Sequence, residues 1–285
     1  MKKNKSILLG AHMSIAGGLE KSIQRGESIG CTAIQIFTKS CRQLFGKVLT
    51  DEQISLFKET FSASSIEIVV AHAGYLINLG SAEKAIAQQS VNALIEELCR
   101  CDQLEIPYLI VHPGSHLGMG REKCLEQIIK HIDIVLNRAK PKTMLLLETM
   151  AGQGTSVCNH FEDIATIIDS CKFPNNIGVC LDTCHTFVAG YDFRDTKTYH
   201  SMWAKFDNII GLDKLKVIHI NDSKKDLGSQ VDRHETLGKG KLGLEPFRLI
   251  INDERFLTVP KILETPKLTI EDDRDNIQLV RKLVK

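Results

Sequence analysis

The sequence predicts a single (β/α)8 barrel, and three observations lead to this fold class. Short apolar runs alternate with amphipathic helical patterns eight times along the chain. Successive runs start about 26 to 44 residues apart, the size of one strand, one helix and their loops. The length of 285 residues suits one such barrel. An open, doubly wound parallel sheet shares this alternation and is the structural alternative.

The expected strands are apolar runs bounded by turn signals, as strands covered on both faces require. In order they are Ile7–Ala11, Ala33–Phe37, Ile66–Ala71, Tyr108–Val111, Met144–Leu147, Ile177–Leu181, Lys216–Ile220 and Pro260–Leu263. Patterns with one apolar helical face lie between and after them. These include Leu19–Ile29, Glu52–Phe61, Glu83–Leu104, Arg121–Arg138, Phe161–Ser170, Glu245–Asn252 and Glu271–Val284. Because neither a linker nor an internal repeat divides the chain, we expect residues 1–285 to form one domain.

Composition narrows the classes of function. With a formal net charge of +1, any nucleic-acid binding must come from local basic patches rather than an overall positive field. No apolar run approaches the roughly 20 residues of a membrane span. The amino-terminal stretch MKKNKSILLGAH is too poor in apolar residues for a secretory signal. We therefore expect a cytoplasmic protein with no membrane partner. An odd count of nine cysteines without small-scaffold spacing predicts mostly buried thiols rather than disulfides.

Polar, mostly titratable side chains stand at the carboxyl end of each expected strand. In a (β/α)8 barrel these ends converge on one mouth. The set comprises His12, Lys39, His72, His112, Glu148, Asp182, His219 and Glu264, joined by His185, Asp232 and His234 from loops. Core packing alone does not explain so many imidazoles and carboxylates aimed at one place, because such groups are costly to gather unless a cation binds them.

The residue types indicate which cation. Mixed histidine and carboxylate ligands without paired cysteines favour zinc, manganese or iron. Nine candidate ligands exceed what one tetrahedral ion uses, so we expect two or three ions that share bridging carboxylates. Three divalent ions outweigh four carboxylates, and such a centre attracts phosphate and activates water. The residues therefore favour phosphodiester hydrolysis, with a metal-dependent sugar isomerase or epimerase as the chemical alternative.

Eight motifs, in order along nearly the whole chain, resemble the endonuclease IV family of apurinic/apyrimidinic endonucleases. They are AHMSIAGGL (11–19), HAGYLINLG (72–80), HPGSH (112–116), LETMAGQG (147–154), LDTCHTFVAGYD (181–192), HINDSK (219–224), VDRHETLGKG (231–240) and ILET (262–265). The resemblance implies a zinc-dependent (β/α)8 barrel that cuts duplex DNA on the 5′ side of abasic sites. The products would be a 3′-hydroxyl and a 5′-deoxyribose phosphate, and blocked 3′ ends are a further possible substrate.

The resemblance also implies a trinuclear zinc centre that is the catalytic site. Zinc by zinc, the ligands would be His72, His112 and Glu148; Glu148 again, with Asp182, His219 and Glu264; and His185, Asp232 and His234. A hydroxide between the first two ions would attack phosphorus, and the third ion would stabilise the departing oxygen. Manganese could replace zinc at one site, because similar ligands accept both metals.

Recognition of the abasic duplex would come from loops at the same mouth. By resemblance, Arg42, Tyr75 and Leu76 would enter the minor groove and fill the gap left by the flipped-out nucleotide. Leu44 departs from the family, where an aromatic residue is common. Candidate phosphate contacts are Lys39, Lys224, Lys225, Arg233, Lys239 and Lys241, and candidate outer groups around the ligands are His12 and His116. Nothing in the sequence indicates a stable protein partner, so we expect a monomer. The alternative from a different class of function is a protein that binds damaged DNA without cutting it.

Overall fold

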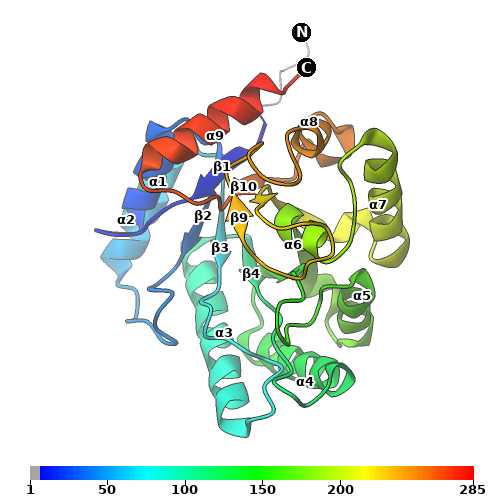
Figure 1. The fold of residues 1–285 in the computed structure, drawn as a ribbon. Helices are drawn as coiled ribbons and strands as arrows, with labels where there is room; N and C mark the ends of the chain where they lie inside the picture. The colour runs from blue at the N-terminus through cyan, green and yellow to red at the C-terminus, as the bar shows by residue number, and fades with distance from the viewer. Residues whose placement is uncertain (1–6) are drawn as a thin grey trace.

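The computed structural model describes residues 7–285, and eight of its strands close into a parallel barrel (Figure 1). The first six residues of the amino-terminal stretch considered above lie outside the described part. The barrel strands are β1 (Leu9–His12), β2 (Ala33–Phe37), β3 (Ile68–His72), β4 (Tyr108–Val111), β5 (Met144–Glu148), β6 (Ile177–Asp182), β7 (Leu215–His219) and β10 (Lys261–Leu263). Gly10 of β1 pairs with Ala33 of β2 on one side and Ile262 of β10 on the other, which closes the sheet. The predicted barrel is confirmed, and the open sheet is excluded.

Helices surround the barrel, and most of them match the predicted segments. They are α1 (Glu20–Ser28), α2 (Asp51–Ala63), α3 (Lys84–Leu104), α4 (Arg121–Ala139), α5 (Phe161–Ser170), α6 (Thr183–Val188), α7 (Thr196–Ile209), α8 (Glu245–Ile251) and α9 (Ile270–Lys282). Short 3-10 turns occupy Pro174–Asn176, Leu212–Lys214 and Glu254–Phe256. Within residues 7–285, no helix has the length and apolarity needed to cross a membrane.

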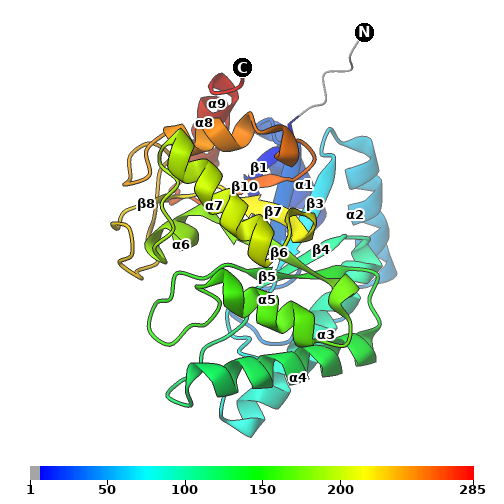
Figure 2. The ribbon, with the colours of Figure 1, turned by 90° about the vertical axis from the view of Figure 1, so that its right-hand side faces the viewer.

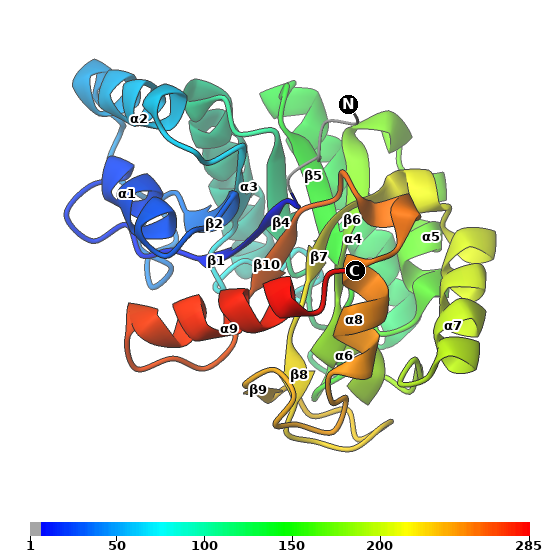
Figure 3. The same cartoon turned by 90° about the horizontal axis from the view of Figure 1, so that it is seen from above.

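The helix α7 was absent from the predicted set, although the sequence carries its signals. Asp195 forms a capping box with Thr198 at the amino end. The buried face has helical spacing, with Tyr199, Trp203 and Phe206 packed inward. A two-stranded hairpin, β8 (Asp222–Ser223) and β9 (His234–Glu235), is also added. Its loops project beyond the barrel strands at one end (Figures 2 and 3).

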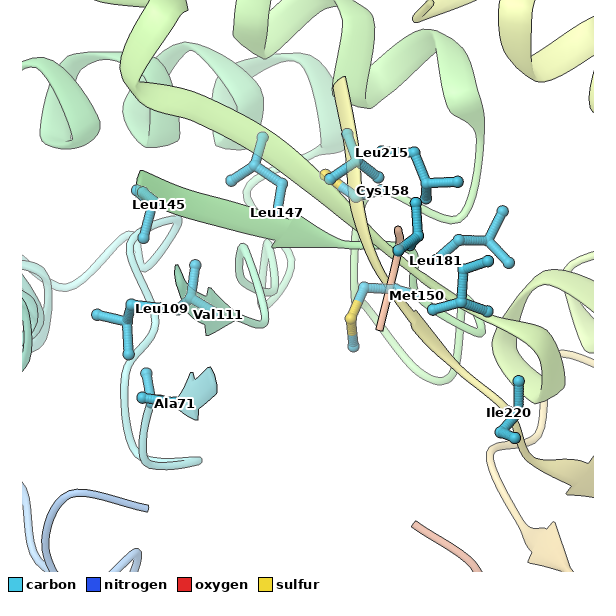
Figure 4. Packing of buried hydrophobic residues seen from close by; sticks show 14 of the residues in the cluster. Ala71, Leu109, Val111, Leu145, Leu147, Met150, Cys158, Leu181, Leu215 and Ile220 are labelled. Atoms are coloured by element: carbon cyan, nitrogen blue, oxygen red, sulfur yellow. The ribbon is translucent and has the colours of Figure 1, made fainter. Parts of the chain in front are cut away.

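Side-chain alternation divides the core into two layers. Inside the barrel, one residue from each of seven strands packs into a separate cluster: Ala33, Val70, Ile110, Leu146, Cys180, Val217 and Ile262. Their neighbours along the strands, such as Leu145 and Leu147, face the helices (Figure 4). All nine cysteines are free thiols, and seven are buried.

The same alternation aims the strand ends at the mouth. Side chains two residues apart share a face of a strand. Val70 faces the barrel interior, so His72 does too; Leu146 similarly brings Glu148 inward, and Cys180 brings Asp182. The strands extend one residue further than predicted at β3, β5 and β6, so these three side chains belong to the rigid sheet rather than to the loops.

Candidate metal centre

The nine histidine and carboxylate side chains predicted as ligands meet at the barrel mouth in three adjoining groups. Within each group, one possible ligand atom per residue lies within 4.8 Å of the others. The first group is His72, His112 and Glu148; the second is Glu148, Asp182, His219 and Glu264; the third is His185, Asp232 and His234. Buried Cys184 also lies beside Asp182 and His234, and burial raises the pKa of its thiol.

Glu148 is shared between the first and second groups. Its Oε2 atom lies 3.0 Å from Nε2 of His72 and 3.2 Å from Nε2 of His112. Its Oε1 atom lies 3.1 Å from Nδ1 of His219. The carboxylate is fully buried at the end of β5, so its two oxygens face opposite groups across one rigid position. This is the arrangement that a bridging carboxylate requires.

Asp182 links the second and third groups. Its Oδ2 atom lies 3.8 Å from Nδ1 of His219 and 3.7 Å from Nε2 of His234. Its Oδ1 atom accepts a hydrogen bond of 2.8 Å from the backbone N–H of His185, because Asp182 both ends β6 and caps α6. The strand-to-helix turn therefore fixes the three-residue spacing of Asp182 and His185 that the sequence displays.

In three of the imidazoles, Nδ1 lies against a backbone carbonyl oxygen, so that Nε2 faces the carboxylates of the cluster. Nδ1 of His72 lies 2.7 Å from the carbonyl oxygen of Ala73, and Nδ1 of His185 lies 2.9 Å from that of Thr149. A carbonyl oxygen only accepts, so these Nδ1 atoms carry the proton and Nε2 presents a lone pair. The corresponding bond of His234 goes to the carbonyl oxygen of residue 264, at 3.1 Å.

Two of those lone pairs have no partner in the protein. Nε2 of His185 and Nε2 of His234 are buried and make no hydrogen bond, although each is within 3.4 Å of an Asp232 oxygen. Buried polar atoms are almost always satisfied, so an orphaned pair aimed at a carboxylate calls for a bound group. Ligand atoms about 2.1 Å from a tetrahedral zinc lie roughly 3.4 Å apart, which matches these separations. The residues therefore fit a metal ion.

The electrostatics of the cluster point the same way. Burial disfavours the charged form of His185, but neighbouring carboxylates, led by Asp182, raise its pKa to about 10. Burial also disfavours the charged form of Glu148, yet the imidazoles of His112 and His219 hold its pKa well below the usual range. Carboxylates that would hold a second proton on His185, at Nε2, create a strongly negative field. A divalent cation is attracted to that field and takes the place of the proton at Nε2.

Two buried amides that the sequence reasoning missed orient these ligands. Oε1 of Gln35 accepts a 2.7 Å hydrogen bond from Nε2 of His219, which leaves Nδ1 for the second group, and Nε2 of Gln35 donates to Glu264 at 2.6 Å. Nδ2 of Asn221 donates to Oδ2 of Asp182 at 2.6 Å. Gln35 lies two residues after Ala33, so both side chains face the barrel interior. A polar residue at this position of an apolar strand is the signal that could have identified it.

The outer histidines predicted around the ligands differ in position. Nδ1 of His12 lies 3.0 Å from Gln35 and 3.6 Å from Oε1 of Glu264, so it contacts the second group from outside. His116 instead accepts a 3.2 Å hydrogen bond from the backbone N–H of Gly118 and organises its own loop. The structure therefore brings only one of the two histidines to the ligands.

The loop residues expected to meet DNA lie at the same mouth. Tyr75 and Leu76 are 61% and 53% exposed, and they are neighbours on one loop. The Tyr75 ring centroid lies 5.9 Å from that of His112, so the tyrosine borders the first group. Arg42 is exposed on the β2–α2 loop, whereas Leu44 is partly buried against the core.

Lys39 corrects one expectation. Its side chain is buried and forms an ion pair with Glu97 of α3, so it is not available to a phosphate. The other five predicted phosphate contacts are exposed on the loops around β8 and β9: Lys224, Lys225, Arg233, Lys239 and Lys241.

The spacing Gly238-x-Gly240-x-x-Gly243 has the spelling of a dinucleotide-binding loop, but in this fold it serves a structural purpose. The backbone N–H groups of Gly238 and Gly240 both donate to Oδ2 of buried Asp222 at 2.9 Å. A Cβ atom at Gly240 would lie only 2.4 Å from Asp222 and from the carbonyl oxygen of Ser223. The pattern therefore wraps a loop around a carboxylate rather than a dinucleotide.

Comparison with known proteins identifies close relatives of the whole chain. Residues 23–283 match the family described as xylose isomerase-like TIM barrel. The probable endonuclease 4 of Geobacter sulfurreducens is 47% identical over 279 residues, covering 97% of this chain and 94% of the relative. That of Chloroflexus aggregans is 46% identical over 278 residues, with 97% of each chain covered.

Solved structures agree with these relatives. The crystal structure of endonuclease IV from Thermus thermophilus has a TM-score of 0.86 and 34% identity, covering 96% of this chain and 98% of that one. A D-psicose 3-epimerase from Clostridium cellulolyticum has a TM-score of 0.70 but only 13% identity, over 97% and 99% of the two chains. The second likeness shows the fold alone.

Proposed function

The chain belongs to the endonuclease 4 family of xylose isomerase-like TIM barrels, and on this premise we propose that it is a DNA-repair endonuclease. Its substrate is duplex DNA containing abasic sites. It hydrolyses the phosphodiester on the 5′ side of the lesion and leaves a 3′-hydroxyl and a 5′-deoxyribose phosphate. Blocked 3′ ends are a second proposed substrate of the same site.

The observation that carries this proposal is the convergence of four carboxylates and five histidines on one mouth, where Nε2 of His185 and Nε2 of His234 are buried without a hydrogen-bond partner. The three groups would hold three Zn²⁺ ions per chain, and one of the sites accepts Mn²⁺ as well. Such ions supply water activation at neutral pH and charge stabilisation for the attacking and leaving oxygens of a phosphodiester. Without cations, the four carboxylates would repel the DNA phosphate.

The protein's own residues contribute rigidity and orientation. Glu148 sets the separation between the first and second groups, because its two oxygens face them from a single buried position. Asp182 links the second group to the third, and the carbonyl oxygen of Thr149 holds the His185 ring in the ligating tautomer. Ligands fixed in this way lose little freedom on binding, which is what a preorganised centre requires.

DNA binding is assigned to the exposed loops of the mouth. The Tyr75 ring and the Leu76 side chain would fill the space that a flipped-out abasic nucleotide leaves in the base stack, with Arg42 entering the minor groove beside them. The five exposed lysines and arginines near β8 and β9 give the local positive charge that a chain of net charge +1 needs in order to hold phosphates. We propose that residues 1–285 form a single catalytic domain that acts as a cytoplasmic monomer.

A cleavage assay tests the proposal directly. The purified protein, incubated with a duplex carrying one abasic analogue, should cut that strand once, on the 5′ side, and a polymerase should extend the new 3′ end. The matched control is the same duplex without the lesion. A protein that binds the lesion but leaves it uncut after zinc and manganese are restored is a damage binder. A protein that turns over free sugars and leaves DNA intact is an epimerase or isomerase.

A further inference from the structure

One face of the long helix α3 holds two mouth loops in place. The loops are the β2–α2 loop (residues 38–50), which carries Arg42, and the β3–α3 loop (residues 73–83), which carries Tyr75 and Leu76. Three side chains of α3 reach them: Glu96, Glu97 and Arg100, called here the α3 clamp. We propose that the α3 clamp presets both loops for binding an abasic duplex. This inference rests on the proposed function.

Glu97 is the point at which the two loops are joined. Its carboxylate is 1% exposed and pairs with the Lys39 ammonium, which is itself buried. Its Oε2 atom also accepts a 2.6 Å hydrogen bond from the hydroxyl of Thr38. From the other loop, the backbone N–H of Gly74 lies 3.4 Å from Oε1. One carboxylate thus holds the start of the first loop and the residue next to Tyr75.

Arg100 and Glu96 bind the backbone of the first loop near both of its ends. The Arg100 guanidinium donates to the carbonyl oxygen of Thr38 at 2.5 Å and to that of Lys47 at 2.6 Å, so one side chain joins two residues that are nine positions apart in the chain. Glu96 accepts a 2.7 Å hydrogen bond from the backbone N–H of Gly46. Between these anchors, Arg42 remains exposed.

The loops also touch each other directly. A Cβ atom placed on Gly74 would lie 3.4 Å from the carbonyl oxygen of Cys41, so the chain beside Arg42 runs against the chain beside Tyr75. Because α3 is a helix of 21 residues, its anchors move as one body. The two loops are therefore held as a pair.

The charges explain why this arrangement favours a binding role. Burying an ion pair contributes little net stability compared with apolar packing, because desolvation offsets the attraction. The pair does favour one geometry, because separating the two charges would leave each of them buried without a partner. If the loops that enter a duplex become ordered only on binding, the entropy lost in ordering them weakens the affinity. Loops that are already ordered avoid this cost. The buried Lys39–Glu97 pair therefore orders the two loops that carry the exposed DNA-contact residues.

The test uses the full-length, metal-loaded enzyme and the variant Glu97→Gln, which keeps the side-chain shape but removes the charge. Binding is measured with a duplex carrying one abasic analogue and an uncleavable linkage on its 5′ side. Loosened loops populate the binding form less, so Kd should rise about tenfold to a hundredfold. The kcat at saturating cleavable duplex should stay within about threefold, and the metal content should not change. The control Glu59→Gln makes the same substitution at an exposed position of α2 and should behave as wild type.

Amide exchange gives a second readout that does not depend on DNA. The N–H groups of Gly46 and Gly74 should exchange faster in Glu97→Gln, while the amides in the middle of α3 keep their protection. If the single variant fails to fold, Lys39→Met with Glu97→Gln removes both charges together and is measured in the same way. Wild-type Kd in a folded, metal-loaded variant overturns the inference. A wild-type enzyme that neither binds nor cuts the abasic duplex refutes the proposed function instead. In that case the α3 clamp is still tested by amide exchange, and unchanged exchange at Gly46 and Gly74 in the variant overturns it.

Discussion

Replacing Gln35 with methionine should weaken metal binding without touching a ligand. Gln35 is fully buried in β2 and makes three polar contacts at the foot of the second group. It accepts from Nε2 of His219 at 2.7 Å, donates to Oε1 of Glu264 at 2.6 Å, and lies 3.0 Å from Nδ1 of His12. Methionine has nearly the same length and volume, so the substitution leaves little cavity and isolates the polar contribution.

The size of the effect follows from those contacts. Two of the three hydrogen bonds go to members of the second group, and each contributes about 1 kcal/mol net. Without them, His219 is free to turn over and to adopt the tautomer that protonates Nδ1, and Glu264 loses a donor. The loss of about 2 kcal/mol corresponds to roughly thirtyfold weaker binding at that site, within the range for outer groups around metal ligands.

Metal retention is the decisive assay. Wild type and Gln35→Met are dialysed against a graded series of a chelator, and the bound zinc is counted by elemental analysis at each step. The variant should lose its first equivalent at a chelator concentration roughly thirtyfold lower, with a comparable fall in kcat/KM on abasic duplex. Gln278→Met, an exposed glutamine on α9, is the matched control. Retention curves that coincide with wild type in a correctly folded variant would refute the positioning role of Gln35.

Three further predictions address the bridge, the wedge and the core. Glu148→Gln should lower the cleavage rate by at least about a thousandfold while the barrel still unfolds cooperatively; a near-normal rate in the gel assay contradicts the bridging role. Tyr75→Ala should raise Kd for abasic duplex by about tenfold to a hundredfold with unchanged zinc content, and equal affinity in a binding titration contradicts the wedge. Burial lowers the pKa of the Lys261 ammonium from 10.5 to about 8, so between these values this group binds more protons in the unfolded chain, and its own contribution to the free energy of unfolding should rise with pH, by up to about 3 kcal/mol. Lys261→Met should remove that rise in denaturant titrations at pH 7 to 10, and an unchanged slope refutes the assignment.

Much of this site follows from local sequence patterns. A strand repeats every two residues, so His72 shares a face with Val70, and Glu148 shares a face with Leu146. Both faces of these strands are apolar, so the polar residues at the strand ends are the local sign of which face meets the mouth. In a closed parallel barrel, all strand ends of one sense lie at one mouth. Residue type and parity are thus enough to place His72 and Glu148 together, although no segment of the chain contains both.

Other features depend on contacts that no local pattern encodes. Gln35 and His219 are 184 residues apart, and Lys39 and Glu97 are 58 apart. Lys39 shows the difference: its position after a strand suggested a phosphate contact, but the loop turns it into α3, where a buried carboxylate meets it.

The division has a physical basis. Backbone periodicity and strand polarity are set by neighbours along the chain, so the sequence alone determined the barrel, the mouth and the residue types gathered there. Which oxygen of Glu148 faces which imidazole, which ring nitrogen carries the proton, and which lysine is buried depend on hydrogen bonds between strands and loops distant in sequence. Those bonds exist only after the barrel has closed, and the tertiary structure alone decided them.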